Sequence, residues 1–149
     1  MTIHFICKGN TFRSRLAETY LNSKQLPNIK VISSGVEAQM NDCGPVTWYA
    51  QRIIQDENLI PFEKPVWDQT TKLLLEEGDL TIFMHQNIYD YAVKHFDFNG
   101  KNFQIWEIPD IRIHLLTFAE EIQKMEVTRN IFTEIQQKVD GLLNTLPLN

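Results

Sequence analysis

The sequence predicts a single α/β domain in which helices cover both faces of a four-stranded parallel sheet. Its 149 residues are enough for one substantial core, and no linker or repeat divides them. Short apolar runs alternate with segments whose apolar residues recur at helical spacing. Strands that alternate with helices form mostly parallel sheets that are buried on both faces. We therefore expect one three-layer domain over residues 1–149.

The first half of the chain provides two strands and two helices. Residues 2–7 (TIHFIC) and 29–35 (IKVISSG) read as buried strands, the second ended by Ser-Ser-Gly. Residues 14–24 between them have a helical apolar stripe. After a polar loop, a second helical stripe is formed by Val46, Tyr49, Ala50, Ile53 and Ile54.

The second half repeats the alternation. Residues 79–85 (DLTIFMH) and 102–108 (NFQIWEI) predict the third and fourth strands. Asp68 is a candidate N-cap for a helix through TTKLLLEE. A further helix is predicted by the apolar residues Ile88, Tyr91, Ala92 and Phe96. The capping-box pair Thr117 and Glu120 predicts the start of a long C-terminal helix, with an interruption near 126–129.

Composition and charge exclude several classes of protein. The net charge of −5 argues against nucleic acid or an anionic membrane as the main partner. No run approaches the roughly 18 apolar residues of a membrane helix, and we expect no signal peptide. Cys7 and Cys43 are too few for a disulfide framework, which fits a reducing compartment such as the cytoplasm. No His or Cys pair has metal-ligand spacing, so we expect no metal and no cofactor.

The stretch CKGNTFRSR at residues 7–15 follows the first strand and enters the first helix. In α/β folds the site lies at the carboxyl ends of the strands. A loop there turns its backbone N–H groups inward and holds an anion such as phosphate. Gly9 and Asn10 tolerate the required backbone. The same N–H groups and the charge of Arg13 favour a thiolate at Cys7, and Arg13 can grip two phosphate oxygens.

CKGNTFRSRLAE resembles the signature of the low-molecular-weight protein tyrosine phosphatases, Cys-x-Gly-Asn-x-x-Arg-Ser before a helix. Ser-Ser-Gly at 33–35 and the stretch LLLEEGDLTIFM resemble later parts of that family. The tripeptide IPD at 108–110 falls where the family has its general acid. The resemblance runs in order over nearly the whole chain.

The resemblance implies a role for each matching residue. Cys7 would attack phosphorus and form a phosphocysteine, and Asp110 would protonate the leaving oxygen and later activate water. Ser14 would stabilise the sulfur, and Asn10 would keep the loop in shape through Ser14 and Ser33. The equatorial oxygens would be held by Arg13 and by the backbone of the loop residues Lys8, Gly9, Asn10, Thr11 and Phe12.

The chain also departs from the family pattern. Arg15 stands where the family usually has Pro, and Phe12 replaces a second loop cysteine that many members have. The positions that usually wall the pocket with aromatic rings carry Gln39 or Met40 on one side, and Arg112 and Ile113 on the other. We therefore expect Gln39 and Arg112 to contact the substrate at a mouth that lacks most of its aromatic wall.

Three functions stay open at this point. The first is hydrolysis of phosphomonoesters, with protein phosphotyrosine or a small phosphomonoester as the partner. The second is hydrolysis of phosphoarginine, because arginine-phosphatase relatives carry Thr at the position of Thr11. The third is a catalytically weak module that only binds phospho-ligands, against which the retained Asp110 argues. Arsenate reduction is disfavoured, because it needs two further cysteines after the third strand and FMHQNIYDYAVKHF has none.

Overall fold

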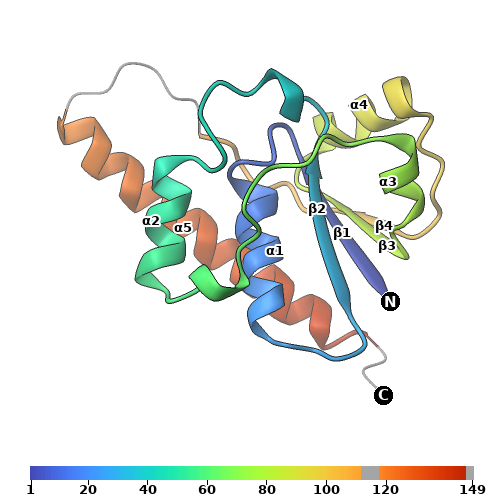
Figure 1. The fold of residues 1–149 in the computed structure, drawn as a ribbon, viewed down its shortest axis with the longest axis horizontal. Coiled ribbons are helices and arrows are strands. Elements are labelled where there is room, and N and C mark those ends of the chain that lie inside the picture. Colours follow the sequence, from blue (N-terminus) through green and yellow to red (C-terminus); the bar gives the residue numbers. More distant parts are fainter. Residues whose placement is uncertain (112–117, 147–149) are drawn as a thin grey trace.

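The computed structural model describes residues 1–111 and 118–146 (Figure 1). Its sheet has four strands in the order β2-β1-β3-β4, and every neighbouring pair is parallel. The strands are β1 (Thr2–Cys7), β2 (Lys30–Gly35), β3 (Leu80–Phe83) and β4 (Phe103–Ile105). The prediction of a four-stranded parallel sheet is therefore confirmed.

Three helices cover one face of the sheet: α1 (Arg13–Ser23), α2 (Trp48–Asp56) and α5 (Phe118–Leu143) (Figure 1). Alternate residues of a strand point to opposite faces, so Ile3 and Phe5 of β1 point toward these helices. Around them lies the main core, to which α1 gives Leu16 and α5 gives Ile135, all fully buried.

The other face is covered by α3 (Lys72–Glu76) and α4 (Gln86–Phe96). A smaller core there contains Ile6, Phe83, Leu75, Ile88 and Ala92. Two short 3₁₀ helices, η1 (Ala38–Met40) and η2 (Ile60–Phe62), lie in the connections. Helices on both faces of one sheet confirm the three-layer α/β domain.

The third and fourth strands are shorter than the predicted ranges 79–85 and 102–108. Beyond β4 the backbone still bonds to its neighbour, since the N–H of Trp106 donates to Phe83 O and that of Ile108 donates to Met84 O. Glu107 between them has a φ of 53°, which breaks the regular strand. Strand-like side-chain alternation in the sequence could not reveal this local kink.

Asp68 was predicted to cap the helix after it, and this was wrong. The cap of α3 is Thr71, whose hydroxyl accepts the N–H of Leu74 at 3.1 Å. Asp68 instead lies behind β2, with its carboxylate 3.0 Å from Lys64 Nζ and its N–H bonded to Asn10 Oδ1. Asp68 is therefore engaged in contacts with Lys64 and with the loop after β1, and the hydroxyl of Thr71 caps α3 in its place.

The predicted interruption of the C-terminal helix near 126–129 was also wrong, because α5 runs unbroken from Phe118 to Leu143. Thr128 is accommodated in it because its hydroxyl donates to Lys124 O, one turn earlier. Thr117 of the predicted capping box lies outside the described residues. Among the helices that the structure describes, none has the length and apolar character to cross a membrane.

Candidate active site

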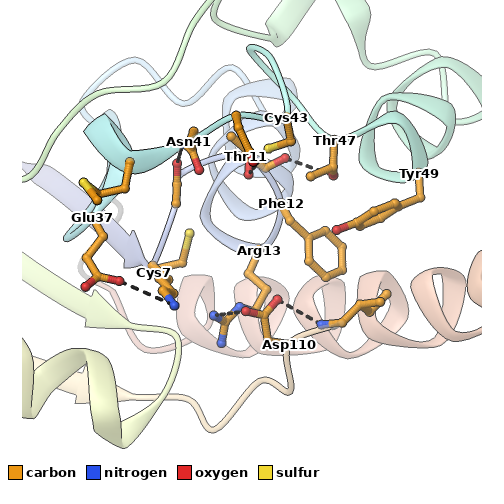
Figure 2. A pocket seen from close by; sticks show the side chains of 15 residues that line it. Cys7, Thr11, Phe12, Arg13, Glu37, Asn41, Cys43, Thr47, Tyr49 and Asp110 are labelled. Atoms are coloured by element: carbon orange, nitrogen blue, oxygen red, sulfur yellow. Dashed lines mark hydrogen bonds and ion pairs between the residues drawn. The ribbon is translucent and has the colours of Figure 1, made fainter. Parts of the chain in front are cut away.

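A pocket of about 470 Å³ opens at the carboxyl end of β1, where residues 7–13 connect this strand to α1 (Figure 2). This is the position that α/β folds use for ligands. The connection, here called the Cys7–Arg13 loop, forms the floor. The lining residues are Cys7, Lys8, Gly9, Thr11, Phe12, Arg13, Glu37, Met40, Asn41, Asp42, Cys43, Thr47, Tyr49, Asp110 and Ile111.

Cys7 is buried at the base of this pocket, and its sulfur has two polar neighbours. The N–H of Asn10 donates to Cys7 Sγ at 3.1 Å. The hydroxyl of Ser14 lies 2.9 Å from the same sulfur. Both groups can donate to a thiolate, and the N-terminus of α1 follows directly.

The loop turns its carbonyl groups outward, and each of them has a donor. The donors to the carbonyls of residues 7–12 are, in order, Val36 N, Glu37 N, Asn41 Nδ2, Arg15 Nη1, Thr47 N and Leu16 N. In a trans peptide unit the N–H points away from the C=O. Holding these carbonyls from outside therefore directs the N–H groups of residues 8–13 to the inner side. The contact of Asn10 N–H with Cys7 Sγ is one result, and the whole is a nest for an oxyanion.

The end of β2 packs tightly against the back of this loop. A Cβ atom on Gly35 would lie 2.6 Å from both Asn10 N and Lys8 O. No side chain fits there without moving the loop backbone. Gly35, the end of the Ser-Ser-Gly segment, is thus required for the loop to close on the sheet.

Asn10 fixes the shape of the loop. It has a φ of 54°, in the left-handed region that Asn tolerates. Its Nδ2 donates to Ser14 Oγ and Ser33 Oγ, both at 2.8 Å, which confirms the two predicted bonds. Its Oδ1 accepts the N–H of Asp68. The side chains of Asn10 and Ser14 are fully buried and are not among the residues that line the pocket, which suits the predicted roles of Asn10 in the loop shape and of Ser14 beside the sulfur.

Arg13 and Asp110, which are far apart in the sequence, contact each other in the pocket (Figure 2). Arg13 Nη2 lies 3.1 Å from Asp110 Oδ2, and Nη1 donates to Ile108 O at 3.0 Å. The Arg13 side chain is 4% exposed and that of Asp110 47%. Arg13 is thus fixed at the pocket floor, while Asp110 can reach solvent and a bound ligand.

Two aromatic rings line the pocket, although the sequence predicted a mouth without most of its aromatic wall. Phe12 packs edge-to-face on Tyr49, with ring centroids 5.0 Å apart. Burial raises the pKa of Tyr49 to about 12, so its hydroxyl stays protonated. Figure 2 shows this hydroxyl directed toward the pocket. Tyr49 comes from the buried face of α2, where an aromatic residue reads as core, so the sequence alone did not assign it to the pocket.

Of the other residues predicted to contact the substrate, Lys8 and Thr11 line the pocket and Gln39 does not. Lys8 lines the pocket and pairs with Glu37 at 3.5 Å. Thr11 also lines it, and its hydroxyl lies 3.7 Å from Cys43 Sγ. Gln39 is not among the lining residues, and its backbone N–H donates to Gln69 Oε1 at 3.0 Å. Of the two neighbours in η1, Met40 lines the pocket and Gln39 does not, and contact of Gln39 with a substrate stays a prediction.

Arg112 and Ile113, predicted for the opposite wall, lie outside the described residues. Glu37, Asn41 and Thr47 were missed by the sequence analysis. Each of them donates a hydrogen bond to a carbonyl of the Cys7–Arg13 loop. Nothing in the sequence marks a polar residue of a distant loop for such a contact.

The family model for low molecular weight phosphotyrosine protein phosphatases matches residues 2–148, and the chain belongs to this family. A search of curated proteins found no match to the sequence.

Solved structures are similar over their full length. A low molecular weight protein tyrosine phosphatase from T. tengcongensis has a TM-score of 0.80 at 20% identity, covering 98% of this chain and 99% of that one. Wzb from Vibrio vulnificus, solved with benzylphosphonate, has a TM-score of 0.77 at 21% identity, covering 97% and 98%. The YwlE arginine phosphatase, solved as a variant with a phosphorylated active-site serine, has a TM-score of 0.70 at 22% identity and covers 100% of both chains.

Proposed function

We propose that this protein hydrolyses phosphomonoesters, foremost protein phosphotyrosine, through a phosphocysteine intermediate on Cys7, and that residues 1–149 form one phosphatase domain. The observation that carries the proposal is the placement of the Cys7 sulfur inside the loop. It accepts the N–H of Asn10 while the loop carbonyls are all bonded on the outer side. A thiol in that position faces the centre of any oxyanion that the N–H groups hold.

In the first step the phosphate group is held by the N–H groups of residues 8–13 and by Arg13. The Arg13 guanidinium carries more N–H groups than its contacts with Ile108 and Asp110 use, so it can also donate to phosphate oxygens. The Cys7 thiolate attacks phosphorus, an S–P bond forms and the bond from phosphorus to the ester oxygen breaks. Protonated Asp110 gives its proton to that oxygen, so a neutral alcohol or phenol leaves.

In the second step water attacks phosphorus and gives a proton to the Asp110 carboxylate. The S–P bond breaks and inorganic phosphate forms. The sulfur leaves as a thiolate, which the Ser14 hydroxyl at 2.9 Å and the Asn10 N–H stabilise. The partial charges of the loop and the full charge of Arg13 give the electrostatic stabilisation of the transition state. The oxygens are neutralised by the protein itself, so this reaction needs no metal or cofactor.

Phosphotyrosine is favoured as the substrate by the rings of Phe12 and Tyr49, which can contact an aromatic leaving group. Phosphoarginine is the second candidate, because Thr11 lines the pocket and an arginine phosphatase is among the similar structures. A comparison of kcat/KM on matched phosphotyrosine and phosphoarginine peptides separates them. A preference for phosphoarginine would replace the first substrate by the second without changing the roles of Cys7 and Arg13.

Cys7 must stay reduced to act, and Cys43 lies in the same pocket lining. We therefore also place the enzyme in a reducing compartment such as the cytoplasm. A pure binding function is disfavoured because the chain places a carboxylate, Asp110, beside the anion site, where it would repel a bound anion unless it also transfers a proton.

The test is turnover of p-nitrophenyl phosphate by the wild type and Cys7→Ser, with and without a metal chelator. We expect activity in the wild type with chelator present, and no measurable turnover in Cys7→Ser although it still binds vanadate. Cys43→Ser is the matched control and should keep activity, since Cys43 contacts Thr11 and not the reacting sulfur. Full activity of Cys7→Ser, or loss of wild-type activity with chelator, would overturn the proposal.

A further inference from the structure

Arg15 is the largest side chain that is fully buried in the described residues. It stands in the first turn of α1, directly behind the Cys7–Arg13 loop, where the family resemblance would place Pro. Burying a guanidinium costs several kcal/mol unless hydrogen bonds and opposite charges compensate. A residue that contributed only packing would therefore be expected to be apolar.

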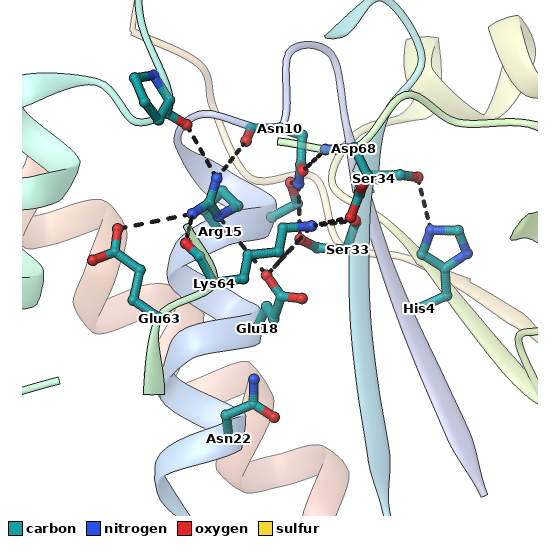
Figure 3. Close-up of polar contacts among 12 residues, drawn as sticks. His4, Asn10, Arg15, Glu18, Asn22, Ser33, Ser34, Glu63, Lys64 and Asp68 are labelled. Atoms are coloured by element: carbon teal, nitrogen blue, oxygen red, sulfur yellow. Dashed lines mark hydrogen bonds and ion pairs between the residues drawn. The ribbon is translucent and has the colours of Figure 1, made fainter. Parts of the chain in front are cut away.

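The guanidinium of Arg15 joins three separate segments (Figure 3). Its Nη1 donates to Pro45 O at 3.0 Å and, more weakly, to Asn10 O at 3.5 Å, and its Nη2 donates to Lys64 O. Pro45 belongs to the stretch that forms one pocket wall, and Asn10 is the centre of the loop. Arg15 thus ties the loop to the wall and to the segment that carries Asp68.

Two carboxylates balance this buried charge. Glu18 Oε2 lies 3.8 Å from Arg15 Nε, and Glu63 Oε1 lies 3.8 Å from Nη2. Glu18 also accepts the hydroxyl of Ser33 at 2.7 Å, and Ser33 in turn accepts Asn10 Nδ2. Burial lowers the pKa of Arg15, and the negative charges of Glu18 and Glu63 act in the opposite direction. Glu18 therefore links the cation to the loop through Ser33, and Glu63 adds a second negative charge.

The contact with Asn10 O has a direct consequence for the pocket. The carbonyl of Asn10 and the N–H of Thr11 belong to one trans peptide unit and point in opposite directions. A donor behind the Asn10 carbonyl therefore keeps the Thr11 N–H directed to the side where an oxyanion binds. It also fixes the residue whose own N–H contacts Cys7 Sγ.

We propose that Arg15 is a positioning residue for Cys7 and for the oxyanion, because its buried guanidinium fixes the Asn10–Thr11 peptide from behind. This inference rests on the proposed function, in which the loop holds phosphate. Arg15 itself does not touch the substrate. Its hydrogen bonds and charge restrict the backbone at this end of the loop, where a Pro would restrict it through its ring.

The test uses Arg15→Met and Arg15→Lys, with Arg52→Met as the control. Arg52 is an exposed arginine on α2 that pairs with Asp56 and does not line the pocket. Three quantities are measured on each purified protein: the Kd of vanadate, the pH at which iodoacetamide alkylates Cys7 at half its maximal rate, and the free energy of unfolding in urea. Vanadate is the probe because it needs no turnover.

For Arg15→Met we expect the vanadate Kd to rise by about 2- to 10-fold, because the Asn10–Thr11 peptide loses the donor that fixes it from behind. The half-maximal alkylation pH should move upward, because one positive charge and one fixed N–H are lost. Arg15→Lys keeps the charge but cannot bridge three carbonyls, so its vanadate Kd should rise while the alkylation pH changes less. Arg52→Met should match the wild type in all three quantities.

A folded Arg15→Met with the wild-type vanadate Kd and alkylation pH would overturn the inference, and leave Arg15 a stabilising residue only. If Arg15→Met does not fold, Arg15→Lys decides: wild-type values in both quantities overturn the inference, and a raised Kd supports it. Failure of the proposed function looks different, because the wild type itself would then not turn over an aryl phosphate, whether or not it binds vanadate.

Discussion

At the scale of single residues, the contact between Asp110 and Arg13 is central to how the site would work. The two side chains lie 3.1 Å apart, and about half of the Asp110 side chain is exposed to solvent. Asp110 Oδ1 also accepts the N–H of Ile111, which orients the carboxylate. Such a group can reach the oxygen of a leaving group once the phosphate occupies the loop.

Asp110→Asn should therefore lower kcat by about 10²- to 10³-fold for a phosphate ester with a poor leaving group. The loss should be much smaller for p-nitrophenyl phosphate, whose leaving group needs little protonation. The measurement is kcat for phenyl and p-nitrophenyl phosphate in wild type and variant. Equal losses on both substrates would mean that Asp110 is structural.

The hydroxyl of Tyr49 is the second group at this scale whose removal should change catalysis. Its protonated hydroxyl can donate a hydrogen bond to a bound phosphate or to its ester oxygen. Tyr49→Phe keeps the ring contact with Phe12 and should lower kcat/KM for an aryl phosphate by about 2- to 10-fold. Tyr20→Phe, whose hydroxyl bonds to Asp140 on the far side of α1, is the control. An unchanged kcat/KM in Tyr49→Phe would show that this hydroxyl does not contact the substrate.

Residues within one continuous motif could be placed from the sequence, because spacing along a strand–loop–helix unit fixes their geometry. Cys7, Asn10 and Ser14 therefore contact one another as expected. Tyr49 and Gln39 could not be placed, since the register of a remote helix and of η1 against the pocket depends on packing. Arg15 reads as a surface helix residue, and only the fold shows that it is buried.

At the scale of elements, the position and type of each strand and α-helix followed from periodicity, and so did the ends of β1, while the ends of β3 and β4 and the cap of α3 did not. β4 stops at Ile105 because of the kink at Glu107, and the α3 cap is Thr71 because Asp68 is needed by the loop. In both cases a tertiary contact overrides a local preference. The same competition explains why α5 continues through residues 126–129, where packing against α1 and α2 outweighs a run of weaker helix formers.

Within β1, His4 makes the stability of the sheet depend on pH. It is fully buried, its Nε2 lies 2.7 Å from Ser34 Oγ, and burial lowers its pKa from 6.5 to about 3. A lowered pKa means that the unfolded chain binds a proton first, so this contribution to stability is present above pH 6.5 and is lost as the pH falls toward 3.

From pH 7 to pH 5 the free energy of unfolding should fall by about 2 kcal/mol on account of His4. His4→Gln cannot titrate, and should show a fall smaller by that amount. The measurement is urea unfolding of both proteins at the two pH values. Parallel pH dependences in wild type and variant would show that His4 is not the titrating group.

At the scale of the whole molecule, the fold gathers at one point groups that lie far apart in the chain. The carboxyl end of β1 supplies Cys7, α2 supplies Tyr49, and the segment after β4 supplies Asp110. Behind the loop, Arg15, Glu18 and Lys64 link α1 to the connection before α3. The parallel topology could be predicted from the alternation of elements, whereas this rear network could not, because it depends on how two loops meet.

The central claim is that Cys7 carries the phosphoryl group during turnover. The most direct measurement is acid quenching of the enzyme during turnover of a ³²P-labelled aryl phosphate, followed by peptide mapping. The label should appear on the peptide that contains Cys7 and should be absent in Cys7→Ala. Turnover without a labelled enzyme, or label on a peptide without Cys7, would contradict the account.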